Sequence, residues 1–253
     1  MIYDLQRASM LKRISAWLLD AILLCIIATL MAFLLSTALN YDSYDARLEA
    51  RYAHFEDEYG VTRNLTQAQV DAMSPEERAN LEAASKAIAE DEEALYAWNM
   101  MLQLMIIITS FGILLAYVVL EFTVPLVLGN GQTIGKKVFG IGVMRQDGVK
   151  VNGVCMFART LLGKYAIETM IPVMMLLMLF MGTIGILGWL IVGAILIAEV
   201  ALLAATKERC MIHDKLANTV TVDIASQMIF NTPEDLMAYK QKVAAEKAAS
   251  QPY

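Results

Sequence analysis

Three long apolar segments constrain this chain more than any other feature of its sequence. They run from Ser15 to Leu39, from Met100 to Leu128 and from Ala166 to Ala205. A helix that crosses a bilayer needs about 20 mainly apolar residues, and each segment reaches that length. The third is about twice as long, and the stretch GTIGILG at Gly182–Gly188 in its centre allows a tight reversal. We therefore predict four transmembrane helices, with three as the main alternative.

The composition agrees with a membrane protein. Hydrophobic residues make up 58% of the chain and charged residues 18%, against about 25% charged in soluble domains. Asp20 interrupts the first apolar segment, which is also too long for a cleaved signal peptide, so we expect this segment to stay as an anchor. A carboxylate in hydrocarbon costs at least about 2.5–3.5 kcal/mol, so Asp20 requires a partner or a function.

The distribution of charge predicts the orientation. Basic residues gather beside the apolar segments: Arg7, Lys12, Arg13, Lys136, Lys137, Arg145, Lys150, Arg159, Lys164, Lys207, Arg209 and Lys215. Residues 41–98 instead hold fourteen acidic and five basic residues. Because Lys and Arg near membrane spans face the cytoplasm, both termini and residues 129–165 are expected there and residues 41–98 outside. An even number of spans follows, which favours four.

The outer segment is predicted to be helical. Thr66–Gln69 and Ser74–Glu77 each have the pattern of a capping box, and Gly60 is suited to end a helix. A helix from Ser74 is expected to run through Tyr96 into the second span. Its acidic residues are interpreted as a solvated helix face, with a divalent-cation site as the alternative.

The inner segment has the pattern of strands. Residues 142–146 and 149–151 flank Asp147-Gly148, which predicts a hairpin with a two-residue type I′ turn. Residues 219–223 alternate as well and add an expected third strand. An amphipathic helix over 153–165 is expected to lie along the membrane surface before the third span.

The predicted fold is therefore an all-α membrane protein with an extracytoplasmic helical insertion and a small cytoplasmic three-strand element. Its expected parts are 1–40 (N-terminal segment and first span), 41–98 (acidic insertion), 99–128 (second span), 129–165 (hairpin and amphipathic helix), 166–206 (third and fourth spans) and 207–253 (strand and tail).

Carboxylates inside the apolar segments form the candidate site. Asp20, Glu121 and Glu199 each lie seven residues from a predicted cytoplasmic boundary, about 10 Å into the membrane, so three helices supply one acid each to a common layer. Glu121 and Glu168 each precede a proline by four residues, and a proline leaves the carbonyl at that position without its helical donor. Free carbonyls beside carboxylates are typical of sodium or proton sites in transporters.

The alternative is a static network of ion pairs. Arg13, Arg159 and Lys164 lie close enough to the expected boundary to neutralise these acids. Arg13 and Asp20 share a helix face, but both side chains lean toward the helix start, so direct contact is not expected. Arg159, or a water or cation, is the expected partner of Asp20.

The order of these motifs resembles the RDD family of bacterial membrane proteins. The resemblance rests on Arg13 and Asp20 in the first helix, GQTIGKK at 131–137, Arg159, and HDxxAxTV from His213. It covers residues 7–40 and 100–224, and it implies that Arg13, Asp20 and Asp214 are the arginine and aspartates for which the family is named. The resemblance also implies a bacterial inner-membrane protein for which transport is suspected.

Three functions are compatible with these features. The preferred one is movement of monovalent cations or protons through the carboxylate layer, in a homo-oligomer, because four helices enclose little room. The second is a membrane anchor or scaffold that recruits a partner through the acidic insertion or the inner sheet. The third is a lipid enzyme, which is disfavoured because no nucleophile–base or metal-ligand set is recognisable. We expect membrane lipids as partners, and no cofactor, resident metal or nucleic acid.

Overall fold

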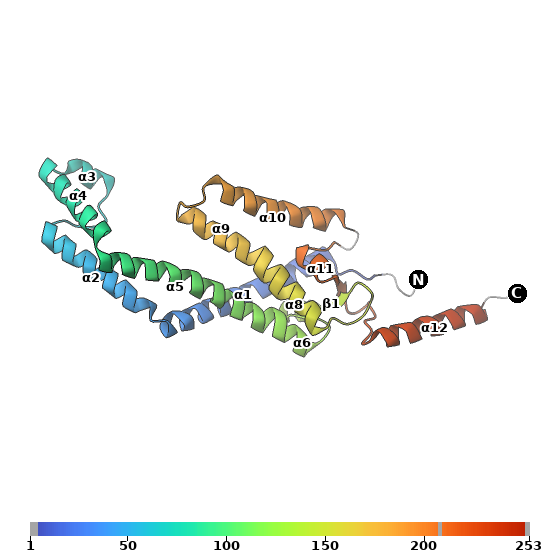
Figure 1. The fold of residues 1–253 in the computed structure, drawn as a ribbon. Helices are drawn as coiled ribbons and strands as arrows, with labels where there is room; N and C mark the ends of the chain where they lie inside the picture. Colours follow the sequence, from blue (N-terminus) through green and yellow to red (C-terminus); the bar gives the residue numbers. More distant parts are fainter. Residues whose placement is uncertain (1–4, 207–208, 251–253) are drawn as a thin grey trace. The chain divides into compact units, whose positions relative to one another are not determined.

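The computed structural model describes residues 5–206 and 209–250; Lys207, one of the basic residues that predict the orientation, lies outside these ranges. Four helical stretches are long and apolar enough to cross a membrane (Figure 1). They are α1 (Met10–Ala38); α5 (Glu92–Tyr117) with η1 (Val118–Thr123) and α6 (Val124–Leu128); α8 (Gly153–Phe157) with η2 (Ala158–Met170) and α9 (Ile171–Phe180); and α10 (Ile186–Ala205). The prediction of four membrane-type helices is confirmed, and the reversal between α9 and α10 falls at 181–185.

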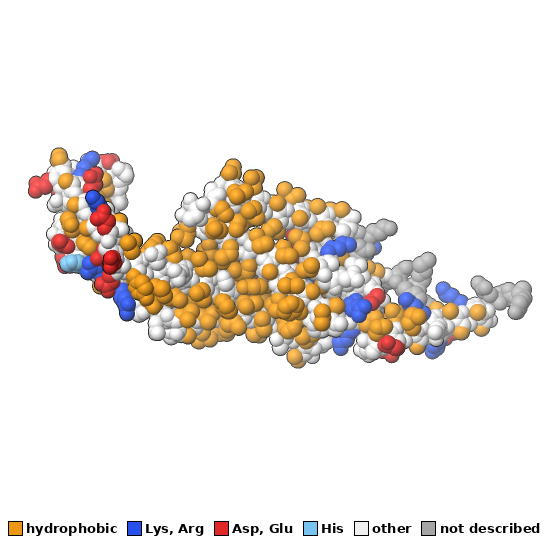
Figure 2. Space-filling view, viewed as in Figure 1, with side chains coloured by type: hydrophobic (Ala, Val, Ile, Leu, Met, Phe, Trp, Pro, Cys, Tyr) orange, Lys and Arg blue, Asp and Glu red, His pale blue; other side chains and the backbone are white. Residues whose placement is uncertain are grey.

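The outer surface of these helices is apolar. Figure 2 shows hydrophobic side chains over the visible face of α9 and α10, and Trp189, Leu190 and Ile197 are all more than half exposed. In α1 the pattern is inverted relative to a water-soluble helix, because its leucines and isoleucines are largely exposed while Ala16 and Asp20 are buried. This surface fits a hydrocarbon solvent and places the aspartate inside the protein.

The chain forms two compact units. The first comprises residues 1–29 and 113–253 and holds a two-stranded antiparallel sheet of β1 (Ile141–Arg145) and β2 (Thr219–Asp223). Val143 faces Thr221 in the register of this sheet, and Val143, Val220 and Val222 are fully buried. Short helices α7 (Ile134–Val138) and α11 (Ile212–Leu216) each precede a strand, and α12 (Pro233–Ser250) follows β2.

The expected three-strand element is wrong in two respects. The sheet has two strands, because residues 149–151 contribute only isolated bridges, one from Lys150 to Met144 and one from Val149 to Phe230. The turn also contains three residues instead of two. The amide of Gly148 donates to the carbonyl of Arg145, and only Gly148 has a positive φ, of 92°. This is the pattern of a turn followed by a left-handed glycine, and a type I′ turn would need two positive φ angles.

The third membrane-type helix begins earlier than expected. It runs without interruption from Gly153 to Phe180, so residues 153–165 are its first turns and not a separate surface helix. Its middle is a π-helix, as is Val118–Thr123 before Pro125. Pro125 and Pro172 have no amide hydrogen to donate, and the residue before each donates to the carbonyl five residues back, Val124 to Val119 and Ile171 to Ala166.

The second unit comprises residues 30–112 and contains α2 (Tyr41–Tyr59), α3 (Gln67–Ala72), α4 (Pro75–Glu90) and the first part of α5. Both predicted capping boxes are present, with the Thr66 and Ser74 hydroxyls accepting from the third helical amides. Gly60 ends α2 with φ of 62°.

The expected continuous helix from Ser74 to the second span is wrong, because Asp91 interrupts it with an extended backbone. Its carboxylate accepts from the amide of Ala94 and pairs with Arg51 at 2.6 Å, and these bonds hold the pKa of Asp91 below its ordinary value.

Candidate functional site

A cavity of about 650 Å³ lies within the first unit. Most of its wall is apolar, with Leu24 from α1 and Ile195 and Leu203 from α10. Ten acidic or basic side chains also line it: Arg13, Asp20, Glu121, Lys136, Arg159, Lys164, Glu168, Glu199, His213 and Asp214. All eight residues that the sequence predicted for a site or as its charge partners are therefore in this one cavity. Hydrogen bonds and ion pairs arrange the ten side chains around three centres, and His213 belongs to both the second and the third.

Asp20 belongs to the first group and is held by the segment that precedes β1. Its carboxylate accepts hydrogen bonds from the Thr133 hydroxyl and, at 2.7 Å, from the amide of Gly135. The ammonium of Lys136 lies 3.9 Å from the same carboxylate. The prediction that Arg159 is the partner of Asp20 is wrong. The GQTIGKK motif supplies the partners instead, because Thr133 caps α7 and its first turn directs the Gly135 amide at α1.

Glu121 shares a cation with this group. Its carboxylate pairs with Lys164 at 2.7 Å and lies 4.0 Å from Lys136, which therefore stands between Asp20 and Glu121. Burial lowers the pKa of Lys136 to about 8, with Glu121 acting in the opposite direction, so Lys136 keeps its charge at neutral pH. The backbone carbonyl of Glu121, expected to be free, accepts from the Thr160 hydroxyl at 2.9 Å. This part of the site is a compensated ion-pair network.

The second group centres on Arg159, which is only 3% exposed. Its guanidinium donates to Asp214, to the Thr219 hydroxyl at 2.9 Å and to Nε2 of His213 at 3.1 Å. Burial opposes ionisation of Asp214, but the Arg159 charge outweighs it and holds the pKa of Asp214 below its ordinary value. Arg13 lies 3.8 Å from Oδ2 of Asp214. Among the described residues, this oxygen is a buried side-chain acceptor with no hydrogen-bond donor.

The third group joins Glu168, Glu199 and His213. The backbone amide and ring Nδ1 of His213 both lie 2.8 Å from the Glu168 carboxylate. Because arginine can only donate, Nε2 of His213 must accept from Arg159, and the ring proton is then on Nδ1. The ring is neutral, in agreement with a His213 pKa that burial and then the charge of Arg159 lower.

Glu168 and Glu199 line the same cavity and both accept hydrogen bonds from the start of α11. Glu168 receives two donors from His213, whereas Glu199 receives the Ile212 amide at 3.3 Å. Among the described residues, neither carboxylate has a lysine or arginine within 4.0 Å. The two glutamates therefore lack the cationic partner that Asp20, Glu121 and Asp214 each have.

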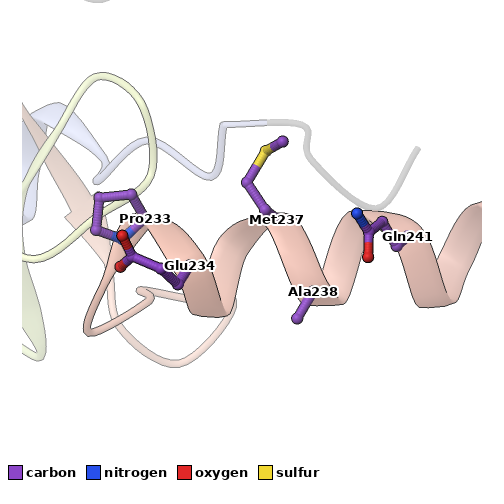
Figure 3. Close-up of a pocket in the computed structure, with 5 residues that line it drawn as sticks. All are labelled: Pro233, Glu234, Met237, Ala238 and Gln241. Carbon is purple, nitrogen blue, oxygen red and sulfur yellow. The ribbon is translucent and has the colours of Figure 1, made fainter.

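A second hollow lies along α12. It measures about 350 Å³ and is formed by one side of the helix (Figure 3). Its lining residues are Pro233, Glu234, Met237, Ala238 and Gln241. They include one exposed carboxylate and no base, so the chemistry described above belongs to the larger cavity.

Sequence reasoning missed Thr133, Gly135 and Lys136 as partners of Asp20 and His213 as a partner of Glu168. The two motifs that contain them, GQTIGKK and HDxxAxTV, are visible in the sequence and supply the signal. Adjacent side chains such as His213 and Asp214 are expected to point apart, which favours a turn that holds the sheet. This expectation is wrong, because Nε2 of His213 lies 3.7 Å from Oδ2 of Asp214 and both side chains contact Arg159.

Four apolar helices whose ionisable side chains face inward define a multi-pass membrane protein. Residues 7–218 match the RDD family, and the chain belongs to that family. The match includes the acidic insertion, which the sequence motifs alone had left outside the resemblance. Neither the comparison with curated proteins nor that with solved structures gives a match.

Proposed function

We propose that this RDD family protein exchanges protons for monovalent cations across the bacterial cytoplasmic membrane. The observation that carries the proposal is that Glu168 and Glu199 line a large cavity and, among the described residues, have no lysine or arginine within 4.0 Å, so we place one exchangeable proton on this pair. A group that moves a proton must hold it reversibly and must be stabilised when the proton leaves. Loss of the Glu199 proton leaves two facing carboxylates, which a cation can stabilise.

The other carboxylates have a supporting role in this proposal. Asp20, Glu121 and Asp214 each have a cationic side chain within 4.0 Å, so a transported cation would compete with Lys136, Lys164 or Arg159. Buried pairs of this kind fix the relative positions of helices, because breaking one leaves an uncompensated charge. The pairing therefore favours a static network for these three acids and an exchange site for Glu168 and Glu199.

The proposed topology keeps both termini and residues 129–152 in the cytoplasm and the second unit's helices α2–α4 outside. The basic residues beside the helix ends support it through the positive-inside rule. The Glu168–Glu199 pair contacts α11, whose neighbours are basic, so the exchange site would open toward the cytoplasmic side. We further propose contact with membrane lipids, a homo-oligomeric state, no enzymatic activity and no cofactor.

The test is dissipation of a pre-formed pH gradient in everted vesicles, with sodium, potassium, lithium and benzyltrimethylammonium chloride added in turn. Wild type is compared with Glu199→Gln, and exposed Glu234→Gln on α12 is the matched control. Dissipation by wild type and Glu234→Gln, lost in Glu199→Gln at equal membrane abundance, supports exchange. If no cation dissipates the gradient through wild type, exchange is refuted and the anchor or scaffold function becomes the better hypothesis.

A further inference from the structure

We propose that the cation taken up by this cavity is an organic ammonium with an apolar body, an inference that rests on the proton–cation exchange proposed above. In the binding step the O–H bond of Glu199 breaks and its proton leaves to water. The ammonium ion then takes its place between the Glu168 and Glu199 carboxylates, and no oxidant or other reactant is required.

The size and lining of the cavity support this class of ligand. A volume of about 650 Å³ is within the range of small-molecule sites, which are mostly apolar with a few fixed polar groups. Leu24, Ile195 and Leu203 supply the apolar wall, and Trp17 and Tyr117 supply aromatic rings. The positive charge of an ammonium is attracted to the face of such rings. A small alkali ion, in contrast, would leave most of the apolar wall without a contact.

A second observation points to a ligand with N–H donors. Oδ2 of Asp214 is buried and has no donor among the described residues, and Asp214 lines the same cavity as the glutamate pair. A buried acceptor without a donor is destabilising, and an N–H group brought into the cavity can remove that penalty. A primary or secondary ammonium offers both the charge and the donors.

The charges of the cavity set the stoichiometry. Its fixed cations are Arg13, Lys136, Arg159 and Lys164, and its carboxyls are Asp20, Glu121, Glu168, Glu199 and Asp214. With a neutral His213, five carboxyls face four positive charges, so one proton on the glutamate pair makes the cavity neutral. After that proton leaves, one monovalent ammonium restores neutrality. Exchange of one proton for one ammonium therefore avoids a net charge inside the membrane, where it would be expensive.

The test is calorimetric titration of the full-length protein in detergent at neutral pH with 2-phenylethylammonium chloride, and separately with sodium chloride. Repetition in two buffers of different ionisation enthalpy gives the number of protons released per cation bound. We expect one proton per 2-phenylethylammonium in wild type and in Glu234→Gln, after subtraction of the signal from protein-free micelles. Glu199→Gln should lose the proton release and bind at least tenfold more weakly.

Trp17→Ala is the second variant, because Trp17 is 61% exposed and its removal leaves the buried network intact. It should weaken binding of 2-phenylethylammonium about threefold to tenfold and leave any sodium binding unchanged. Proton release by sodium alone would overturn the organic-ammonium inference and leave the proposed exchange function standing. No binding and no proton release with either cation would overturn the inference, and no gradient dissipation in vesicles would overturn the function.

Discussion

Replacement of Arg159 by methionine tests the most deeply buried ion pair of the protein. The side chain is 3% exposed and Asp214 is 1% exposed, so neither charge has solvent to compensate for loss of the other. Arg159→Met keeps most of the side-chain volume but removes the donors to Asp214, Thr219 and His213.

The magnitude follows from what remains around Asp214. Removal of one partner of a buried ion pair costs about 3–5 kcal/mol, because the other charge is left in a poorly polar environment. Arg13 remains at 3.8 Å, beyond hydrogen-bond distance, so we expect it to recover only a small part. For a chain of this size each kcal/mol lowers the unfolding temperature by about 2–4 °C, which predicts a decrease of about 6–20 °C.

Thermal unfolding in detergent measures this decrease, with Lys12→Met as the matched control. Lys12 also pairs with an aspartate, Asp223 at 2.6 Å, but its side chain is 43% exposed. An exposed pair contributes about 0–1 kcal/mol, so the control should change the unfolding temperature by less than about 4 °C. In the double variant Arg159→Met/Asp214→Asn the orphaned charge is gone, and part of the lost stability should return.

Equal shifts for Arg159→Met and Lys12→Met would refute the reasoning, because burial would then make no difference to the pair. Strict additivity of the Arg159→Met and Asp214→Asn effects would refute it independently, since residues in contact are expected to show an interaction energy.

Three further predictions concern other contacts. Gly135→Ala should lower the unfolding temperature in detergent, because its Cβ would overlap the carbonyl oxygen of Ala16. His213→Gln should reduce the loss of thermal stability between about pH 7.5 and about pH 5.5. Burial lowers the pKa of folded His213 below 6.5, so the unfolded chain binds the extra proton first and stability falls as pH falls through that range. Asp91→Ala should speed amide hydrogen exchange in the first turn of α5, because the hydrogen bond to the Ala94 amide and the ion pair with Arg51 are lost. The free energy of local unfolding of this turn should fall by about 1–2 kcal/mol.

Each of these has a control and a contradicting result. In Gly148→Ala the added Cβ has no atom within 4 Å, although the positive φ of this residue adds backbone strain. A larger decrease in the unfolding temperature for Gly148→Ala than for Gly135→Ala would argue against the close approach at Gly135. For His213, the exposed His54 is the control, and an unchanged pH profile in His213→Gln would show that another group titrates. For Asp91, exchange at the wild-type rate in Asp91→Ala would mean that the helix start is held by other contacts.

The membrane spans, the capping boxes and the stop at Gly60 were predictable from the sequence because each depends on neighbours a few residues away. An apolar run of more than about 20 residues has few alternatives to a membrane helix. A Ser or Thr hydroxyl at a helix start reaches the third amide in almost any surrounding. The break at Asp91 was missed because it depends partly on Arg51, forty residues earlier in the chain.

The residues of the candidate site were also predictable, since an ionisable side chain in an apolar segment requires an explanation. Their partners were not. Helical spacing gives the face on which Asp20 lies, but not that the Gly135 amide, 115 residues away, would meet it. The turn type was likewise decided by context, because Asp147 keeps a negative φ and only Gly148 is left-handed.

The sequence by itself therefore determined which solvent each segment of this protein faces and which side chains cannot face lipid. Only the tertiary structure decided that Asp20, Glu121 and Asp214 are neutralised by basic side chains while Glu168 and Glu199 have no lysine or arginine within 4.0 Å among the described residues. The physical reason is that hydrophobicity and helix capping act over one or two turns. The charge state of a buried group depends on every donor and charge brought within a few ångströms, and those groups come from helices far apart in the chain.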